Sequence, residues 1–150
     1  RRQRQMCIRD RHKRPLCGGG QRRKTFLALI AQLIRCGVEV RLIHAKEPGP
    51  NFREDFDKYP VLYDCLERVL CPRVHFKMLV FDCKEVYVGI ANLTSAGFGM
   101  KGEDKQNFEA GILTDDPAIV EQAMNQFDAV WIGKHCKKCK RREFCLDSIL

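Results

Sequence analysis

The stretch HFKMLVFDCKEVYVGIAN at residues 75–92 carries the most information in this chain of 150 residues. If residues 74–81 form a strand, side chains two positions apart share a face, so His75 and Lys77 project from one side of a sheet. An imidazole beside an ammonium group can bind and attack a phosphate. The full pattern is H-x-K-x4-D-x6-G-x-x-N, formed by His75, Lys77, Asp82, Gly89 and Asn92.

This spacing is specific. With each residue type at about one position in twenty, a given histidine meets all four further offsets by chance on the order of once in 10⁵. A lone strand histidine is more often a structural residue, and a lone lysine is more often solvated. The joint pattern therefore favours a catalytic site over these simpler readings.

The surrounding residues predict alternating helices and strands. Apolar spacing indicates a helix over about 22–36, closed by Gly37, and a strand from Val38 to Ile43. A helical region is expected over about 53–70, with a fresh start at Pro60. Further strands are expected at 74–81, 84–90 and 107–114, and a last helix from Pro117, capped by Asp116, to Trp131. The expected fold class is α/β, a mixed-sheet sandwich with helices packed on the sheet.

The motif resembles the HKD motif of the phospholipase D superfamily. LIRCGVEVRLI at 33–43 resembles the helix and strand that precede that motif, and NFEAGIL at 107–113 resembles the later strand with its acidic residue. The resemblance implies one phospholipase-D-like repeat over 25–132. Ile90 departs from the family pattern, because a small hydroxyl residue usually follows the glycine and would donate a hydrogen bond near the phosphate.

The resemblance also implies roles for the site residues. His75 would be the nucleophile that forms a phosphohistidine, or its acid partner. Lys77 and Asn92 would stabilise the non-bridging phosphate oxygens. Glu109 would orient the imidazole, and Asp82 would brace the motif locally.

A single motif implies only half of a catalytic site. In this family two histidines act on opposite sides of the phosphorus atom, and they come from two repeats or two subunits. His12, His44 and His135 stand in no comparable motif. We expect a homodimer that brings two copies of His75 together, and the alternative is a second repeat lost upstream.

Residues 1–24 are expected to be disordered. The segment 1–11, RRQRQMCIRDR, resembles a translated sequencing-adapter remnant of the kind found in metagenomic reading frames; the alternative is a basic arm for nucleic acid. It carries a net charge of +4 in a chain of net charge +8. The segment 12–24 has the composition of a loop, so the strand that should precede the first helix is missing, which indicates truncation.

The C-terminal segment 133–150 is predicted to bind a metal. Three of the nine cysteines follow the spacing C-x2-C-x5-C in HCKKCKRREFC, namely Cys136, Cys139 and Cys145. Cys71 is the expected fourth ligand and His135 the local alternative. We expect structural Zn²⁺, although the spacing also resembles the [4Fe–4S] staple of Cas4-like and helicase-associated nucleases, and a disulfide or chance clustering would be simpler.

The other cysteines suggest no site. Cys36, Cys65 and Cys83 stand in apolar surroundings and are expected to be buried core residues.

The expected function is that of a phosphodiesterase acting on nucleic acid. The apolar runs fall short of the roughly 20 residues of a membrane span, and no secretory signal is visible, so a cytoplasmic protein is expected. The small basic chain favours nucleic acid over phospholipid, which remains the alternative substrate. A different class of function, a non-catalytic nucleic-acid-binding or scaffold module, is favoured by Ile90.

Overall fold

The computed structural model describes residues 4–10, 25–45, 49–90 and 109–145. In chain order its elements are β1 (Arg4–Asp10), α1 (Phe26–Arg35), β2 (Val38–His44), α2 (Pro50–Asp57), α3 (Val61–Cys65), β3 (Leu66–Leu70), β4 (Met78–Phe81), β5 (Glu85–Gly89), β6 (Gly111–Thr114), α4 (Pro117–Trp131) and two short 3-10 helices (Cys136–Lys138 and Arg142–Phe144).

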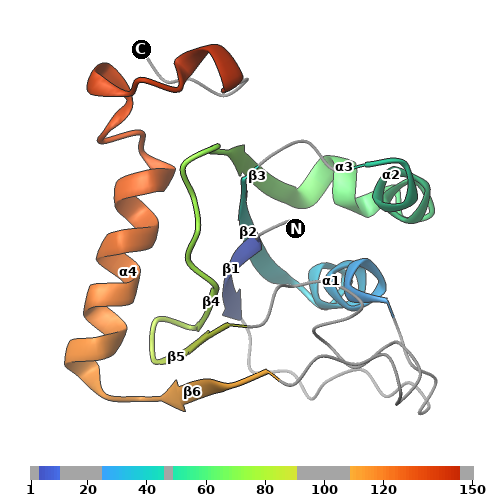
Figure 1. The fold of residues 1–150 in the computed structure, drawn as a ribbon. Coiled ribbons are helices and arrows are strands. Elements are labelled where there is room, and N and C mark those ends of the chain that lie inside the picture. Colours follow the sequence, from blue (N-terminus) through green and yellow to red (C-terminus); the bar gives the residue numbers. More distant parts are fainter. Residues whose placement is uncertain (1–3, 11–24, 46–48, 91–108, 146–150) are drawn as a thin grey trace.

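One mixed sheet forms the middle layer of the molecule, with six strands in the order β3-β2-β1-β4-β5-β6. Helices α1, α2 and α3 lie on one side of this sheet and α4 lies on the other (Figure 1). Helices on both faces of a mixed sheet define an α/β sandwich. The fold class expected from the sequence is therefore confirmed.

Strand β1 lies in the middle of the sheet. It runs antiparallel to β2 over its full length, from Arg4 opposite His44 to Asp10 opposite Val38, and parallel to β4. The expectation that residues 1–24 lack order is therefore wrong for 4–10, and the strand that we expected to be missing before the first helix is present. A strand between two neighbours is held by backbone hydrogen bonds on both edges, and local composition is a weak guide to such pairing.

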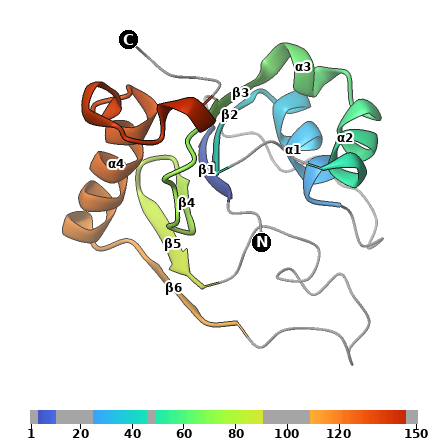
Figure 2. The ribbon, with the colours of Figure 1, turned by 45° about the horizontal axis from the view of Figure 1, so that its top comes forward.

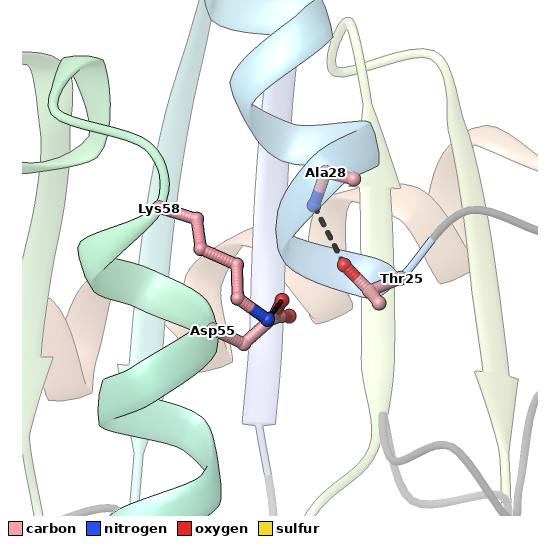
Figure 3. Close-up of polar contacts among 4 residues, drawn as sticks. All are labelled: Thr25, Ala28, Asp55 and Lys58. Carbon is pink, nitrogen blue, oxygen red and sulfur yellow. Dashed lines mark hydrogen bonds and ion pairs between the residues drawn. The ribbon is translucent and has the colours of Figure 1, made fainter.

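The first helical layer covers β2. Its buried residues from α1, α2, α3, β2 and β3 form one cluster: Leu27, Ile30, Ala31, Val38, Val40, Leu42, Phe52, Phe56, Leu62 and Leu66. The hydroxyl of Thr25 caps α1 by accepting a hydrogen bond from the Ala28 amide at 3.2 Å, and Lys58 reaches Asp55 at 3.5 Å at the end of α2 (Figure 3). Gly37 was expected to close α1. It has a φ of 87°, a backbone conformation that residues with a side chain rarely adopt.

Residues 66–70 form strand β3, so the expected helix over about 53–70 is wrong there. Pro60 does begin a fresh helix, but α3 ends at Cys65. Leu66 and Leu70 are four residues apart and both buried, which matches a helical period as well as a strand. Residues 66–70 form a strand because they pair in parallel with β2. In this pairing Arg41 stands opposite Glu67 and forms a salt bridge with it at 2.8 Å.

Helix α4 covers the opposite face of the sheet, and its predicted bounds are confirmed. Asp116 caps it by accepting hydrogen bonds from the amides of Ala118 at 2.9 Å and Ile119 at 3.2 Å. Its buried side chains pack in two clusters, one against β4 and β5 and one against Ile43 and Val74. None of the helices among the described residues is long and apolar enough to cross a membrane.

The strands β4, β5 and β6 form an antiparallel meander at one edge of the sheet, each shorter than the sequence predicts. Tyr87 of β5 packs across its two glycine neighbours, Gly89 and Gly111, which pair with each other. A Cβ atom on Gly89 would lie 2.7 Å from the Tyr87 ring carbon Cζ and 2.9 Å from the Ala110 carbonyl oxygen. A Cβ atom on Gly111 would lie 2.5 Å from the same ring carbon. Both glycines are therefore needed to make room for the tyrosine.

We predict that Gly89→Ala lowers the free energy of unfolding by about 1–3 kcal/mol, because the added methyl group overpacks against the tyrosine ring. Urea denaturation measures this change. In a Tyr87→Ala background the penalty should shrink, leaving the part caused by the Ala110 carbonyl. Glu85→Ala, at an exposed position of the same strand, is the control and should change stability by less than about 0.5 kcal/mol. An equal penalty in both backgrounds would show that the tyrosine is not the cause.

Candidate active site

The directions of β4, β5 and β6 bring most of the predicted catalytic residues to one end of the sheet. Because β5 runs antiparallel to both of its neighbours, the start of β4, the end of β5 and the start of β6 lie together. His75 and Lys77 precede β4, and Glu109 precedes β6. Asn92, expected just after β5, lies outside the described residues. The meander therefore gathers in space residues that are more than 30 positions apart in the chain.

His75 and Lys77 lie in the connection that leads into β4, which begins at Met78, so the predicted strand over 74–81 is wrong for its first four residues. His75 is exposed and Lys77 is half-buried. The ladder continues one step beyond the strand, because the Lys77 carbonyl accepts a hydrogen bond from the Gly89 amide at 3.1 Å. This bond holds the lysine backbone beside the end of β5.

The neighbours of His75 hold it in place. Val74 is only 4% exposed and packs with Ile43 and Phe127, and Phe76 packs against both clusters that α4 makes with the sheet. Because Val74 and Phe76 are both packed towards α4, the backbone of His75 between them is fixed although its side chain is exposed. The imidazole is thus accessible on a fixed segment, as a nucleophile must be.

Glu109 is half-buried and lies next to the end of β5. The Ile90 amide donates to the Ala110 carbonyl at 3.0 Å, which extends the pairing of β5 and β6 one step beyond Gly89 and Gly111. The backbones of Glu109 and Lys77 therefore lie on opposite sides of the end of β5, Glu109 next to β6 and Lys77 next to β4. This position is compatible with the orienting role expected for Glu109.

Asp82 lies away from the other site residues. It follows β4 and lies in the tight turn to β5, where the Lys84 amide donates to the Phe81 carbonyl at 2.9 Å. Asp82 and Cys83 have φ values of 50° and 57°, the left-handed conformation that a tight hairpin turn requires. Aspartate tolerates this conformation better than most residues. The four residues of β4 separate Asp82 from the end where His75 lies, so its place in the fold is that of a turn residue.

Tyr87 is a candidate site residue that the sequence reasoning missed. Its ring reaches across Gly89 and Gly111, towards the end of the sheet where Lys77 and Glu109 lie. Its position two residues before Gly89 was the available signal, since side chains two apart on a strand share a face. A phenol hydroxyl there can donate a hydrogen bond, in a region where the side chain of Ile90 offers no donor.

Apolar side chains are exposed beside this end of the sheet. Val88 and Ile112 are directly paired across β5 and β6 and are 44% and 69% exposed, and Ile90, which stands in the place of the expected hydroxyl residue, is 59% exposed. Positions two apart on a strand share a face, so Val88 and Ile90 extend one apolar patch together with Ile112. β6 is also an edge strand.

Two of the three C-terminal cysteines line one cavity together with Cys71. A cavity of about 230 Å³ between α4 and the connection from β3 to β4 is lined by Cys71, His135, Cys136 and Cys139. The Cys145 thiol donates to the Leu70 carbonyl at 3.4 Å. In the part of the chain that the structure describes, no three His, Cys, Asp or Glu side chains are arranged to hold a metal ion.

The remaining described cysteines differ from expectation. Cys65 is exposed, and Cys36 and Cys83 are half-buried, so the prediction that all three are buried core residues is wrong. Cys36 and Cys83 stand at a helix end and in a tight turn, where the chain meets solvent.

A shifted pKa occurs away from the candidate site. Tyr63 on α3 donates a hydrogen bond to Asp57, and this bond, with some burial and the charge of the carboxylate, raises the pKa of the tyrosine. The pair lies in the helical layer opposite α4 (Figure 1). Its titration is therefore not part of the chemistry proposed for His75.

Comparison with known proteins identifies the family of the chain. A family model described as "Cardiolipin synthase, PLD-like domain" matches residues 17–131, which include every element from α1 to α4. No curated protein and no solved structure gave a significant match. The match covers most of the chain and contains the whole HKD pattern, so the chain belongs to the PLD-like domain family of the phospholipase D superfamily.

Proposed function

We propose that the chain is a phosphodiesterase that cleaves its substrate through a phosphohistidine on His75. The observation that carries the proposal is the meeting of the start of β4, the end of β5 and the start of β6, which brings His75, Lys77 and Glu109 to one end of the sheet. Membership of a superfamily of phosphodiesterases supports the same reaction class.

The reaction has two steps. A ring nitrogen of neutral His75 attacks phosphorus, the bond to the leaving oxygen breaks, and a general acid gives that oxygen a proton. Water then attacks the phosphohistidine, loses a proton to the same group, and releases the phosphate product with free imidazole. Lys77 and Asn92 stabilise the charge on the non-bridging oxygens in both steps, while Glu109 holds the imidazole in one orientation.

The general acid is proposed to be His75 of a second copy of the chain. The apolar patch of Val88, Ile90 and Ile112 supports this, because it lies beside the catalytic end of the sheet and on its outer strands. A two-fold dimer that covered this patch would bury it and place two catalytic ends near each other.

Nucleic acid is the proposed substrate. The segment after α4 carries exposed Lys134, Lys137, Lys138, Lys140 and Arg141, and such a cluster attracts a polyanion. Phospholipid is the second candidate, favoured by the description of the matching family model as a cardiolipin synthase and by the exposed apolar patch.

We predict that His75→Ala lowers the hydrolysis rate of bis(p-nitrophenyl) phosphate by about 10³-fold or more, because the nucleophile is lost. The assay contains no added metal. His12→Ala, outside the motif and outside the residues matched by the family model, is the control and should keep the parental rate. Equal rates for the parental chain and His75→Ala would refute the catalytic proposal and leave a binding or scaffold module.

The substrate class is tested with the same pair of variants on single-stranded DNA, RNA and phosphatidylcholine vesicles. Cleavage of nucleic acid that depends on His75 and weakens with rising salt is expected. If only phosphatidylcholine is cleaved, the proposed substrate is lipid and not nucleic acid.

The shared site predicts that specific activity rises with protein concentration over the range in which sedimentation shows dimers forming. Ile112→Glu should give an inactive monomer with an unchanged circular dichroism spectrum, because a charge would be buried in the dimer interface. Ile119→Glu, at an exposed isoleucine on α4, is the matched control and should remain an active dimer. An active monomer would show that one chain contains the whole site.

A further inference from the structure

Cysteines from two distant parts of the chain lie around the end of α4. Cys71 follows β3, whereas Cys136, Cys139 and Cys145 follow α4. Figure 2 shows the C-terminal segment turning back from α4 towards the end of β3. Three of the four cysteines line one cavity, and the fourth, Cys145, donates to the carbonyl of Leu70, the neighbour of Cys71.

We propose that Cys71, Cys136, Cys139 and Cys145 bind one zinc ion, which fastens the C-terminal segment to the connection that carries His75. Four thiolates satisfy the tetrahedral preference of zinc at about 2.3 Å each. The four thiols are half-buried, and the exposed lysines and arginines of the C-terminal segment offset the charge of the thiolates.

The proposal requires the thiols to move closer together than they are in this structure, because no three of the described His, Cys, Asp or Glu side chains are arranged to hold a metal ion. The change would take place in the C-terminal segment. It contains two 3-10 helices of three residues each, and its Cys145 thiol donates to the Leu70 carbonyl at 3.4 Å. Four metal–sulfur bonds would stabilise the rearranged segment.

His135 lines the same cavity, but we assign it no bond to the metal. It is adjacent to Cys136 in the chain, and two adjacent residues chelate one tetrahedral ion poorly. The four cysteines complete the coordination without it.

The proposed site has a consequence for the candidate active site. The Cys71 amide donates to the His44 carbonyl at 2.9 Å, and the Val74 amide donates to the Cys71 carbonyl at 3.0 Å. His75 follows directly after this turn. A metal on Cys71 would thus fix the start of the connection, whose other end is held by the bond between Lys77 and Gly89.

The test measures metal content and stability of the full chain. After purification without added metal, elemental analysis should find about one zinc per chain. Cys139→Ser should lose most of the zinc and melt at a lower temperature, whereas Cys65→Ser, at an exposed cysteine outside the cluster, should match the parental chain. His135→Ala should also retain its zinc. A strong chelator should lower the melting temperature of the parental chain, and zinc alone should restore it.

Four results would overturn the proposal. Metal-free parental chain that gains no stability from added zinc would exclude the site. A disulfide among these cysteines, found by alkylation and mass spectrometry without reductant, would replace the metal by a covalent link. Retention of zinc in Cys139→Ser would exclude the assigned ligands. Iron with inorganic sulfide in a brown protein would overturn zinc as the occupant in favour of an iron–sulfur cluster on the same thiolates.

Discussion

The antiparallel ladder of β4, β5 and β6 is the constraint on which the candidate site depends. Its register places Met78 opposite Val88 and Gly89 opposite Gly111. The start of β4, the end of β5 and the start of β6 therefore lie together at one end of the sheet, although they are far apart in the chain. The two glycines permit this register because Tyr87 lies over both of them. A local steric requirement in β5 is therefore linked to the positions of Lys77 and Glu109 in space.

Helix α4 supports the site from the other face of the sheet. Its buried residues pack against β4 and β5 and against Val74, so one helix holds both the meander and the connection that carries His75. The helix also ends beside the cavity lined by Cys71, Cys136 and Cys139. The accessible histidine thus lies on a segment that is packed on its α4 side and hydrogen-bonded at both ends, which favours a preorganised nucleophile.

Local signals predicted α4 well and predicted β3 and β1 poorly. Asp116 and Pro117 are strong start signals, and the helix they begin is held by contacts along one face. Leu66 and Leu70 suit a helix and a strand equally, and only the neighbouring edge of β2 decides between them. The arginine-rich residues 4–10 carry no apolar period, and β1 forms because β2 and β4 offer it backbone partners on both sides. Strand pairing between distant segments leaves little trace in either segment alone.

By itself, the sequence determined the family and the α/β class, because residue types at fixed short spacings and the periods of the apolar residues carry that information. Only the tertiary structure decided which residues of the motif lie at the same end of the sheet. It separated Asp82 from His75 by the length of β4, set Glu109 beside the end of β5, and brought Tyr87 towards the same end. It also placed Cys71 at the cavity reached by the C-terminal cysteines. These relations depend on strand direction, register and helix packing, which are properties of the whole sheet and not of any one segment.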